Sequence, residues 1–178
     1  MLDVAFVLFY ADGIRTVGID LVIERAGVAK ASFYRHFPSK AALIVAYLDR
    51  RRDAFLAWLS EEVATRASGP REQLLAIFDA LGELSMDSDY RGCAFNNALA
   101  EAGADPLVLE RVTAYKYALR AYLTGLAKAA ECSAPGDIAD AWMVLVDGTM
   151  VGGRVCRNPR PAQQARRAAA LLLDDDAG

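Results

Sequence analysis

Hydrogen-bond-donating side chains are concentrated near the start of the chain, between residues 30 and 40. Six that can share one face are Lys30, Ser32, Tyr34, Arg35, His36 and Lys40. Cationic groups and hydroxyls of this kind bind phosphate oxygens, and the longer ones also reach base edges in a groove. The chemistry that they offer is non-covalent recognition of a nucleic acid. It requires a local fold that presents all of them on one surface.

The surrounding residues 18–40 predict such a fold as two short helices joined by a tight turn at Ala26 and Gly27. Their apolar residues recur at the helical period and can share one small core: Ile19, Val22, Ile23, Val28, Phe33 and Phe37. The donors then fall on the opposite face of the second helix. This pattern indicates a helix-turn-helix unit in which residues 28–37 form the recognition helix.

The string AGVAKASFYRHFPSK at residues 26–40 resembles the DNA-binding signature of the tetracycline-repressor (TetR) family of bacterial regulators. The positions that carry the resemblance are Gly27, Tyr34, His36, Phe37, Ser39 and Lys40. An ordered string at fixed offsets is far more specific than a short helix-turn-helix pattern alone. A second, looser resemblance, to the body of one TetR subgroup, lies in RGCAFNNALAE at residues 91–101 and VDGTM at residues 146–150.

The resemblance implies a role for each residue of the recognition helix. By family position, Lys30 and its neighbour Ala31 face the DNA groove. Phosphate contacts are carried over to Ser32, Tyr34, His36 and Lys40. Arg35 can serve either role. Gly18 stands where the family often has a Thr or Ser N-cap, Ala29 where it often has Ser, and Ala31 where Gly is common. We therefore expect individual backbone contacts to differ while the fold is kept.

The resemblance also implies a function: a ligand-responsive repressor that binds a partly palindromic double-stranded DNA operator as a homodimer. A small apolar effector that enters the body would shift the helix beginning at Ser39 and change the separation of the two DNA-binding heads. It would weaken DNA binding only to the extent that it prefers the non-binding conformation. One alternative is a helical DNA-binding protein whose body binds a protein partner.

A small helical enzyme is the remote alternative, and the inventory of catalytic groups argues against it. The one histidine, His36, lies in the recognition helix, and no Gly-rich phosphate loop is present. Cys93, Cys132 and Cys156 are odd in number and widely spaced, which predicts reduced thiols and neither a disulfide framework nor a zinc site. We therefore expect no enzymatic activity, no metal and no cofactor.

Length and charge are consistent with a DNA-binding regulator. The 178 residues are 54% hydrophobic, which is enough for one small and one medium domain but excludes a long multidomain enzyme. The net charge of −3 excludes a general nucleic-acid-coating protein, yet residues 1–52 hold eight Lys and Arg against five Asp and Glu. The apolar start lacks a basic leader, and no stretch is long and apolar enough to span a membrane. These features predict a cytoplasmic protein.

Helical periodicity continues through the rest of the chain and predicts an all-α fold of about nine helices. A first helix ends near Gly13, and a long one begins after Ser39. Later helices begin at Pro70, at Pro106 and near Pro135, and the last covers residues 161–173, followed by a frayed tail at residues 174–178. The expected domains are a three-helix helix-turn-helix head at residues 1–46 and a helical ligand-binding and dimerisation body at residues 47–178.

An effector pocket in this body needs apolar walls and a few polar groups. The candidate walls are Trp58, Phe78, Phe95, Tyr115, Tyr122, Trp142 and Met143. The candidate polar lining is Asn97, Glu101, Lys116 and Asp147. The alternative for the aromatic residues is ordinary core packing, and for Lys116 it is full exposure or a structural ion pair with Glu101 or Asp147.

Small residues in the last two helices predict a dimer interface. Gly148 and Gly152 lie one turn apart with Gly153 beside them, and glycines inside a helix allow close approach of a partner. The final helix offers a shallow stripe: Ala165, Ala168, Ala169 and Leu172. A neighbouring helix of the same chain is the alternative partner for the glycines.

The first basic residue of the sequence is Arg15. Other helix-turn-helix proteins use a basic N-terminal arm to add phosphate or minor-groove contacts. We therefore expect this sequence to bind its operator more weakly, and with a shallower salt dependence, than a version extended by a basic arm.

Overall fold

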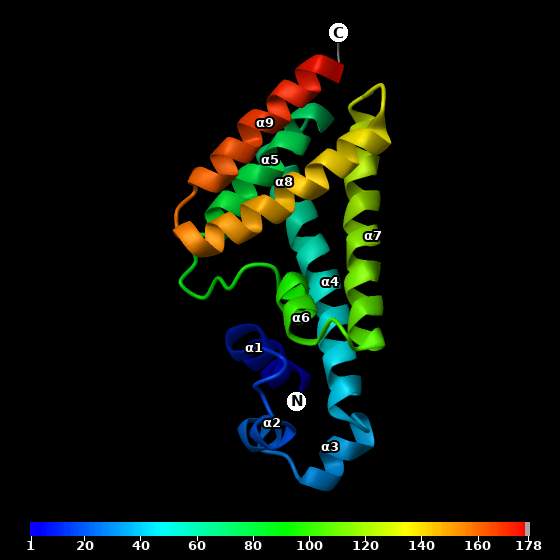
Figure 1. Cartoon of the computed structure of the whole chain (residues 1–178), viewed down its shortest axis with the longest axis vertical. Helices are drawn as coiled ribbons and strands as arrows, with labels where there is room; N and C mark the ends of the chain where they lie inside the picture. Colours follow the sequence, from blue (N-terminus) through cyan, green and yellow to red (C-terminus); the bar gives the residue numbers. More distant parts are fainter. Residues whose placement is uncertain (177–178) are drawn as a thin grey trace. The chain divides into compact units, whose positions relative to one another are not determined.

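The computed structural model describes residues 1–176, and within them it contains nine α-helices and no strand (Figure 1). The helices are α1 (Leu2–Asp12), α2 (Ile19–Ala26), α3 (Lys30–His36), α4 (Lys40–Arg66), α5 (Pro70–Leu84), α6 (Ala94–Ala102), α7 (Pro106–Ala129), α8 (Pro135–Cys156) and α9 (Arg160–Asp176). The predicted all-α fold is confirmed.

Local sequence signals set most helix boundaries. Gly13 follows α1 at φ +91° and donates its N–H to the Phe9 carbonyl. Ser39 caps α4, since its hydroxyl accepts the Ala42 N–H at 3.1 Å. Asp105 caps α7 in the same way ahead of its first-position proline. These are the stops and starts that the sequence predicts.

The described chain divides into two compact units. Unit 1 comprises residues 1–54 and 94–115, and unit 2 comprises residues 55–93 and the chain from Lys116 onward. The predicted division into a head at residues 1–46 and a body at residues 47–178 stays a prediction.

Unit 1 contains α1, α2, α3, α6 and the adjoining parts of α4 and α7. Aromatic residues organise its core. The rings of Phe9 and Tyr47 meet edge to face at 5.3 Å, and those of Phe95 and Tyr115 stack at 3.8 Å. An edge-to-face pair such as Phe9 and Tyr47 stabilises beyond its buried area by about 0.5–1.5 kcal/mol. The two ring pairs join α1 to α4 and α6 to α7 within this unit.

Arg51 of α4 makes a second connection to α1. Its guanidinium lies 3.7 Å from the centre of the Phe6 ring and 4.1 Å from that of Tyr10, and it donates to the Phe6 carbonyl. A guanidinium is suited to this position because its planar, weakly hydrated group can stack on rings while it donates. The first helix is thereby held on α4.

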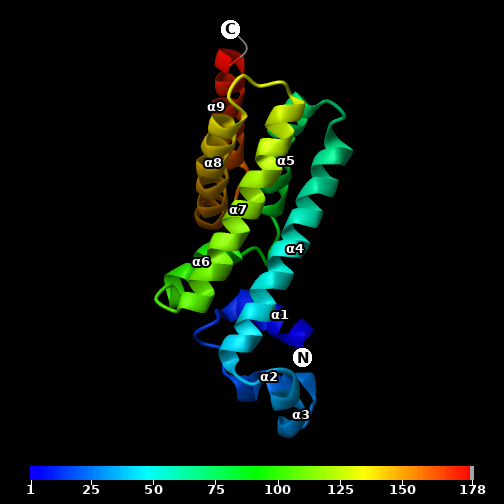
Figure 2. The same cartoon turned by 90° about the vertical axis from the view of Figure 1, so that its right-hand side faces the viewer.

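Unit 2 contains α5, α8, α9 and the remaining parts of α4 and α7. Figures 1 and 2 show α5, α8 and α9 side by side. Trp142 is fully buried, and its indole N–H donates to the Leu74 carbonyl at 2.9 Å. Gly82 of α5 allows the close approach of Ala162 on α9, because a Cβ at Gly82 would lie 3.1 Å from the Ala162 Cβ.

The end of α9 caps the turn before α8. The Asp176 carboxylate accepts the Ser133 N–H at 2.9 Å, the Ser133 hydroxyl at 2.7 Å and the Ala134 N–H at 3.3 Å. The Ser133 hydroxyl bond, together with these backbone N–H groups, holds the pKa of Asp176 below its usual range. Residues 174–176 are therefore helical, contrary to the expected frayed tail; residues 177 and 178 of that prediction lie outside the described residues.

Candidate nucleic-acid interface

The turn between α2 and α3 has the geometry of a helix-turn-helix. Gly27 adopts the left-handed conformation at φ +64°, and its N–H donates to the Glu24 carbonyl at 3.1 Å. The Val28 N–H donates to the Ile23 carbonyl at 3.4 Å, which completes a C-terminal capping motif. A side chain at Gly27 would be strained at this φ, so glycine sets the angle at which α3 leaves α2.

The recognition helix is shorter than predicted. The sequence indicated residues 28–37, whereas α3 covers Lys30–His36. Val28 belongs to the turn, and Phe37 is extended because the residue before a proline is disfavoured in the helical region. Both side chains are nevertheless half-buried, and Phe33 between them is fully buried.

The outward face of α3 carries the predicted DNA-binding residues. With Lys40, they form what we call the recognition surface: Lys30, Ala31, Ser32, Tyr34, Arg35, His36 and Lys40. Five are exposed, and Ser32 and Lys40 are partly buried. Phe33 anchors the helix from the opposite side at 0% exposure. One helix of seven residues therefore buries its apolar side chain and presents its donors to solvent.

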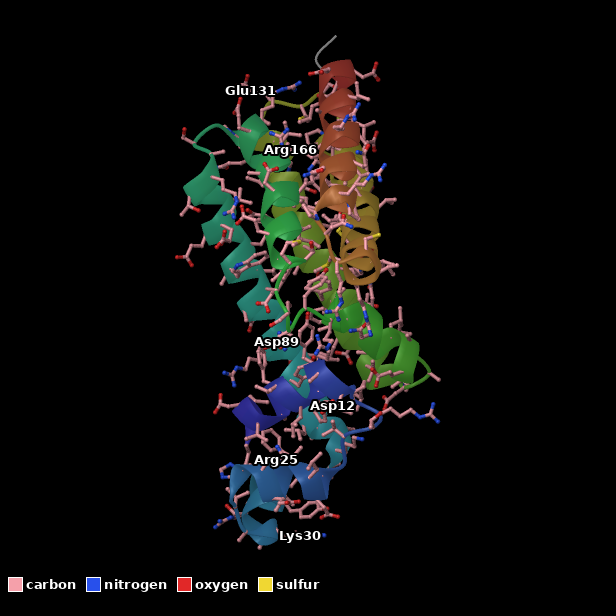
Figure 3. The ribbon with its side chains drawn as sticks, turned by 90° about the vertical axis from the view of Figure 1, so that its left-hand side faces the viewer. Asp12, Arg25, Lys30, Asp89, Glu131 and Arg166 are labelled. Carbon is pink, nitrogen blue, oxygen red and sulfur yellow. The ribbon has the colours of Figure 1, made fainter. Side chains whose placement is uncertain are left out.

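Lys30, which is labelled in Figure 3, is held beside α2 by an exposed ion pair with Asp20 at 2.9 Å. The hydrogen bond to Asp20 raises the pKa of the Lys30 ammonium. Figure 3 also shows Arg25 on α2 in the same part of unit 1. Exposed pairs of this kind are weak and are screened by salt. Lys30 can therefore exchange Asp20 for an acceptor on DNA at little cost.

Lys40 lies in the first turn of α4, and its ammonium donates to the Arg15 carbonyl at 3.1 Å. Burial lowers the pKa of this ammonium, and the negative charge of Glu101 opposes that effect. An ammonium group has three donors. Lys40 can thus hold the Arg15 carbonyl and still donate to a phosphate.

The predicted effector residues of unit 1 are Phe95, Asn97, Glu101 and Tyr115. Phe95 and Tyr115 are buried against each other, whereas Asn97 is half-buried. Glu101 instead accepts the Arg15 N–H at 2.8 Å, a bond that its sequence position did not predict. Their role as pocket lining stays a prediction.

The predicted effector residues of unit 2 are Trp58, Phe78, Lys116, Tyr122, Trp142, Met143 and Asp147. Lys116 donates to both carboxylate oxygens of Asp147, at 2.5 and 2.7 Å, which is one of the two ion pairs considered from the sequence. Phe78 and Trp142 are fully buried 6.0 Å apart. Trp58, Tyr122 and Met143 are half-buried, and burial raises the pKa of Tyr122. These residues too stay predicted pocket lining.

The predicted interface residues on α8 lie on two different sides of the helix, one exposed and one packed against other parts of the chain. Gly148 is exposed, and a Cβ there would meet nothing within 4 Å. A Cβ at Gly152 would lie 2.8 Å from Pro161, and one at Gly153 would lie 2.8 Å from the Ser85 Cβ. The structure therefore shows packing within the chain at Gly152 and Gly153, the alternative considered for them.

The predicted interface residues on α9 also differ in their exposure. Ala165 and Ala169 are buried within unit 2, Ala168 is half-buried and Leu172 is exposed. Three valines that sequence reasoning missed lie on the outward face of α8: Val144, Val151 and Val155 are 72%, 56% and 77% exposed. Together with Gly148 they recur at helical spacing, the signal that could have revealed them. These four residues are called the α8 outer face below.

Within residues 1–176, the structure contains no cluster of three or more His, Cys, Asp or Glu side chains that could hold a metal ion. Over the same residues, no helix combines the length and apolar character that a membrane crossing requires.

Comparison with known proteins agrees with this geometry. Residues 1–47 match the sequence model of the family described as bacterial regulatory proteins, tetR family. The HTH-type transcriptional activator FasR of Mycolicibacterium smegmatis is 32% identical over 92 residues, which cover 52% of this chain and 41% of FasR. The chain thus spans less than half the length of that curated relative.

Solved structures share the fold along nearly the whole chain. A TetR-family transcriptional regulator from Streptomyces coelicolor superposes with a TM-score of 0.87 at 29% identity, covering 99% of this chain and 94% of that one. A TetR transcriptional regulator from Chloroflexus aurantiacus gives a TM-score of 0.82 at 20% identity over 97% of this chain and 91% of that one. Together with the helix-turn-helix and its family match, this shows that the chain belongs to the TetR family of transcriptional regulators.

Proposed function

We propose that this protein is a ligand-responsive transcriptional repressor that binds a partly palindromic DNA operator as a homodimer. The observation that carries the proposal is the recognition surface: donors on the outward face of α3, held by the buried Phe33 and by the glycine turn that sets the angle of α3. Donors on a helix of this kind suit base edges in the major groove, with phosphates on either side.

The α8 outer face supports the dimer. Monomeric proteins seldom leave three valines exposed along one helical stripe, and Gly148 among them would let a second helix approach closely. A two-fold axis through such a face pairs α8 with its own copy. Two recognition helices would then enter successive major grooves about 34–36 Å apart.

The effector is a small apolar molecule that binds the body. Its release of DNA follows from linkage: it must bind the non-binding conformation more tightly than the binding one. The aromatic and polar residues assigned above to the pocket are the candidates for contact. A body that binds a protein partner instead is the competing proposal.

Three measurements test these proposals in order. The first selects duplexes from a randomised pool with the unaltered protein and determines its mass by light scattering; selection of a two-fold sequence by a dimer is the expected result. Failure to select any duplex, or selection by a monomer, would contradict the operator proposal.

The second measurement screens apolar and aromatic compounds by thermal shift and by the fluorescence of the buried Trp142 and half-buried Trp58. A ligand at a hundred times its dissociation constant stabilises by about 2.7 kcal/mol, which is readily seen. A hit must also lower affinity for the selected duplex. No hit in a broad screen, combined with capture of a specific protein, would favour the partner proposal.

The third measurement determines whether the protein represses or activates. The assay is transcription in vitro from a promoter that contains the selected duplex. FasR is named as an activator, so both outcomes are informative. Reduced transcript with the unaltered protein supports the repressor. Increased transcript would replace repression by activation while the operator proposal stands.

A further inference from the structure

Glu101 occupies a position that helix electrostatics disfavours. It lies in the last turn of α6, where the negative end of the helix dipole repels a carboxylate. The structure shows what offsets this: its Oε2 accepts the N–H of Arg15 at 2.8 Å, across 86 residues of sequence. Both residues belong to unit 1, so this bond joins α6 to the turn between α1 and α2.

The turn is shaped to receive the carboxylate. Gly13 has φ +91°, and a Cβ built there would lie 2.7 Å from both oxygens of Glu101. Any other residue at this position would be strained and would also displace the carboxylate. Ile14 and Val17 are buried on either side of Arg15 and fix the turn from within.

Lys40 also binds the backbone of Arg15, at its carbonyl group. Its ammonium donates to the Arg15 carbonyl at 3.1 Å, so α6 holds the backbone donor of Arg15 while α4 holds its acceptor. Both backbone groups of Arg15 are therefore paired with side chains from distant segments of the chain. The orientation of α2, which begins four residues after Arg15 at Ile19, is thus set by two other helices.

We propose that Glu101 is a positioning residue for DNA binding: its carboxylate holds the turn between α1 and α2, so that the place of α6 sets the orientation of the helix-turn-helix. The inference rests on the operator binding proposed above.

Three substitutions at Glu101 distinguish the effect of its side-chain length from the effect of its negative charge. Glu101→Ala removes the acceptor, Glu101→Asp keeps the charge but is one methylene shorter, and Glu101→Gln keeps an oxygen at the same reach without charge. The control is Glu110→Ala, which removes an exposed carboxylate of α7 that pairs with its neighbour Arg111. Each is titrated against the duplex selected by the unaltered protein.

The expected changes in DNA affinity are opposite to those that charge repulsion alone would give. Removing a carboxylate near DNA ordinarily strengthens binding, because repulsion of phosphates falls. Glu101→Ala and Glu101→Asp should instead bind about tenfold more weakly, the effect of one lost charge-assisted hydrogen bond. Glu101→Gln should stay within about threefold of the unaltered protein because a neutral acceptor keeps most of the bond. The slope against salt should be unchanged, since Glu101 touches no phosphate.

Hydrogen exchange at the Arg15 amide distinguishes positioning by Glu101 from a general loss of stability. A general loss of stability would not single out the Arg15 amide in the Ala and Asp variants. Exchange should be about tenfold faster in the Ala and Asp variants than in the Gln variant. If Glu101→Ala does not fold, Glu101→Asp decides. Affinity in Glu101→Asp equal to that of Glu110→Ala, or affinity loss with unchanged Arg15 exchange, would overturn the inference. If the unaltered protein selected no duplex, operator binding would fail first and the inference with it.

Discussion

The outward faces of α3 and α8 are built alike but have opposite chemistry. Each helix buries a large aromatic residue, Phe33 in α3 and Trp142 in α8, and exposes the residues on the other side. The exposed side of α3 carries Lys30 and Arg35, whereas that of α8 carries valines. A charged face loses affinity as salt rises, while an apolar face does not. The two faces therefore predict two partners that salt can distinguish, DNA and a second copy of the chain.

The largest effect is expected on the α8 outer face. Val151→Asp combined with Val155→Asp places two carboxylates where the proposed dimer would exclude water, so association should be lost. Operator affinity should fall by about a hundredfold or more, because two linked half-site contacts become one. Light scattering and duplex titration of the same samples measure both effects. A folded variant that remains dimeric would remove this face from the interface.

Gly152→Leu is the matched substitution on the inward side of the same helix. Because its Cβ would lie 2.8 Å from Pro161, overpacking should lower the free energy of unfolding by about 1–3 kcal/mol. Thermal unfolding measures this loss. We expect the folded fraction to remain dimeric; complete dissociation without loss of stability would return Gly152 to the interface that the sequence alone predicted.

The next effect is expected at Lys30. Lys30→Ala should weaken binding to the selected duplex by about tenfold and relax the preference for one base pair, as expected for a groove contact. Titration against singly substituted duplexes measures the preference. Lys128→Ala, an exposed lysine of α7, serves as the charge control. An equal loss on every duplex would make Lys30 a phosphate contact.

Lys40→Ala should have a smaller and uniform effect. Affinity should fall severalfold on all duplexes, and the slope of log affinity against log salt should become shallower by about 0.9, the contribution of one phosphate contact. The bond to Arg15 gives this lysine a second role, so its affinity loss should exceed what the slope alone accounts for. An unchanged slope would leave Lys40 with the structural role only.

The smallest effect is expected at Asp20, the partner of Lys30. Asp20→Ala frees the lysine and removes a carboxylate close to the DNA-facing surface, so binding should tighten by at most about twofold at low salt. The difference should vanish at high salt because the pair is exposed. A titration at two salt concentrations is sufficient, and weaker binding would show that Asp20 orients Lys30 productively.

Local signals made the helix-turn-helix predictable. The Ala26-Gly27 turn, the buried Phe33 and the cap at Ser39 each act over a few residues, and the structure places all of them as the sequence indicated. The ends of α3 were missed because Val28 and Phe37 can reach the core from a turn as well as from a helix. Burial alone does not distinguish the two conformations.

Long-range contacts account for the rest. Nothing near Glu101 in sequence indicates that its partner is Arg15, and the direction of Gly152 depends on where α9 packs. The sequence left Lys116 either fully exposed or paired with Glu101 or Asp147, and only the fold shows that its partner is Asp147. The exposed valines of α8 were readable from their spacing and were overlooked in favour of the glycines.

The carboxylate of Asp176 has a practical consequence for engineering the carboxy-terminal end. Because it accepts hydrogen bonds from Ser133 and Ala134, the last turn of α9 helps to fold a segment more than forty residues earlier in the chain. Truncation after Leu173 would remove this carboxylate and leave the Ser133 and Ala134 groups without their acceptor. An affinity tag placed after a flexible spacer preserves this contact.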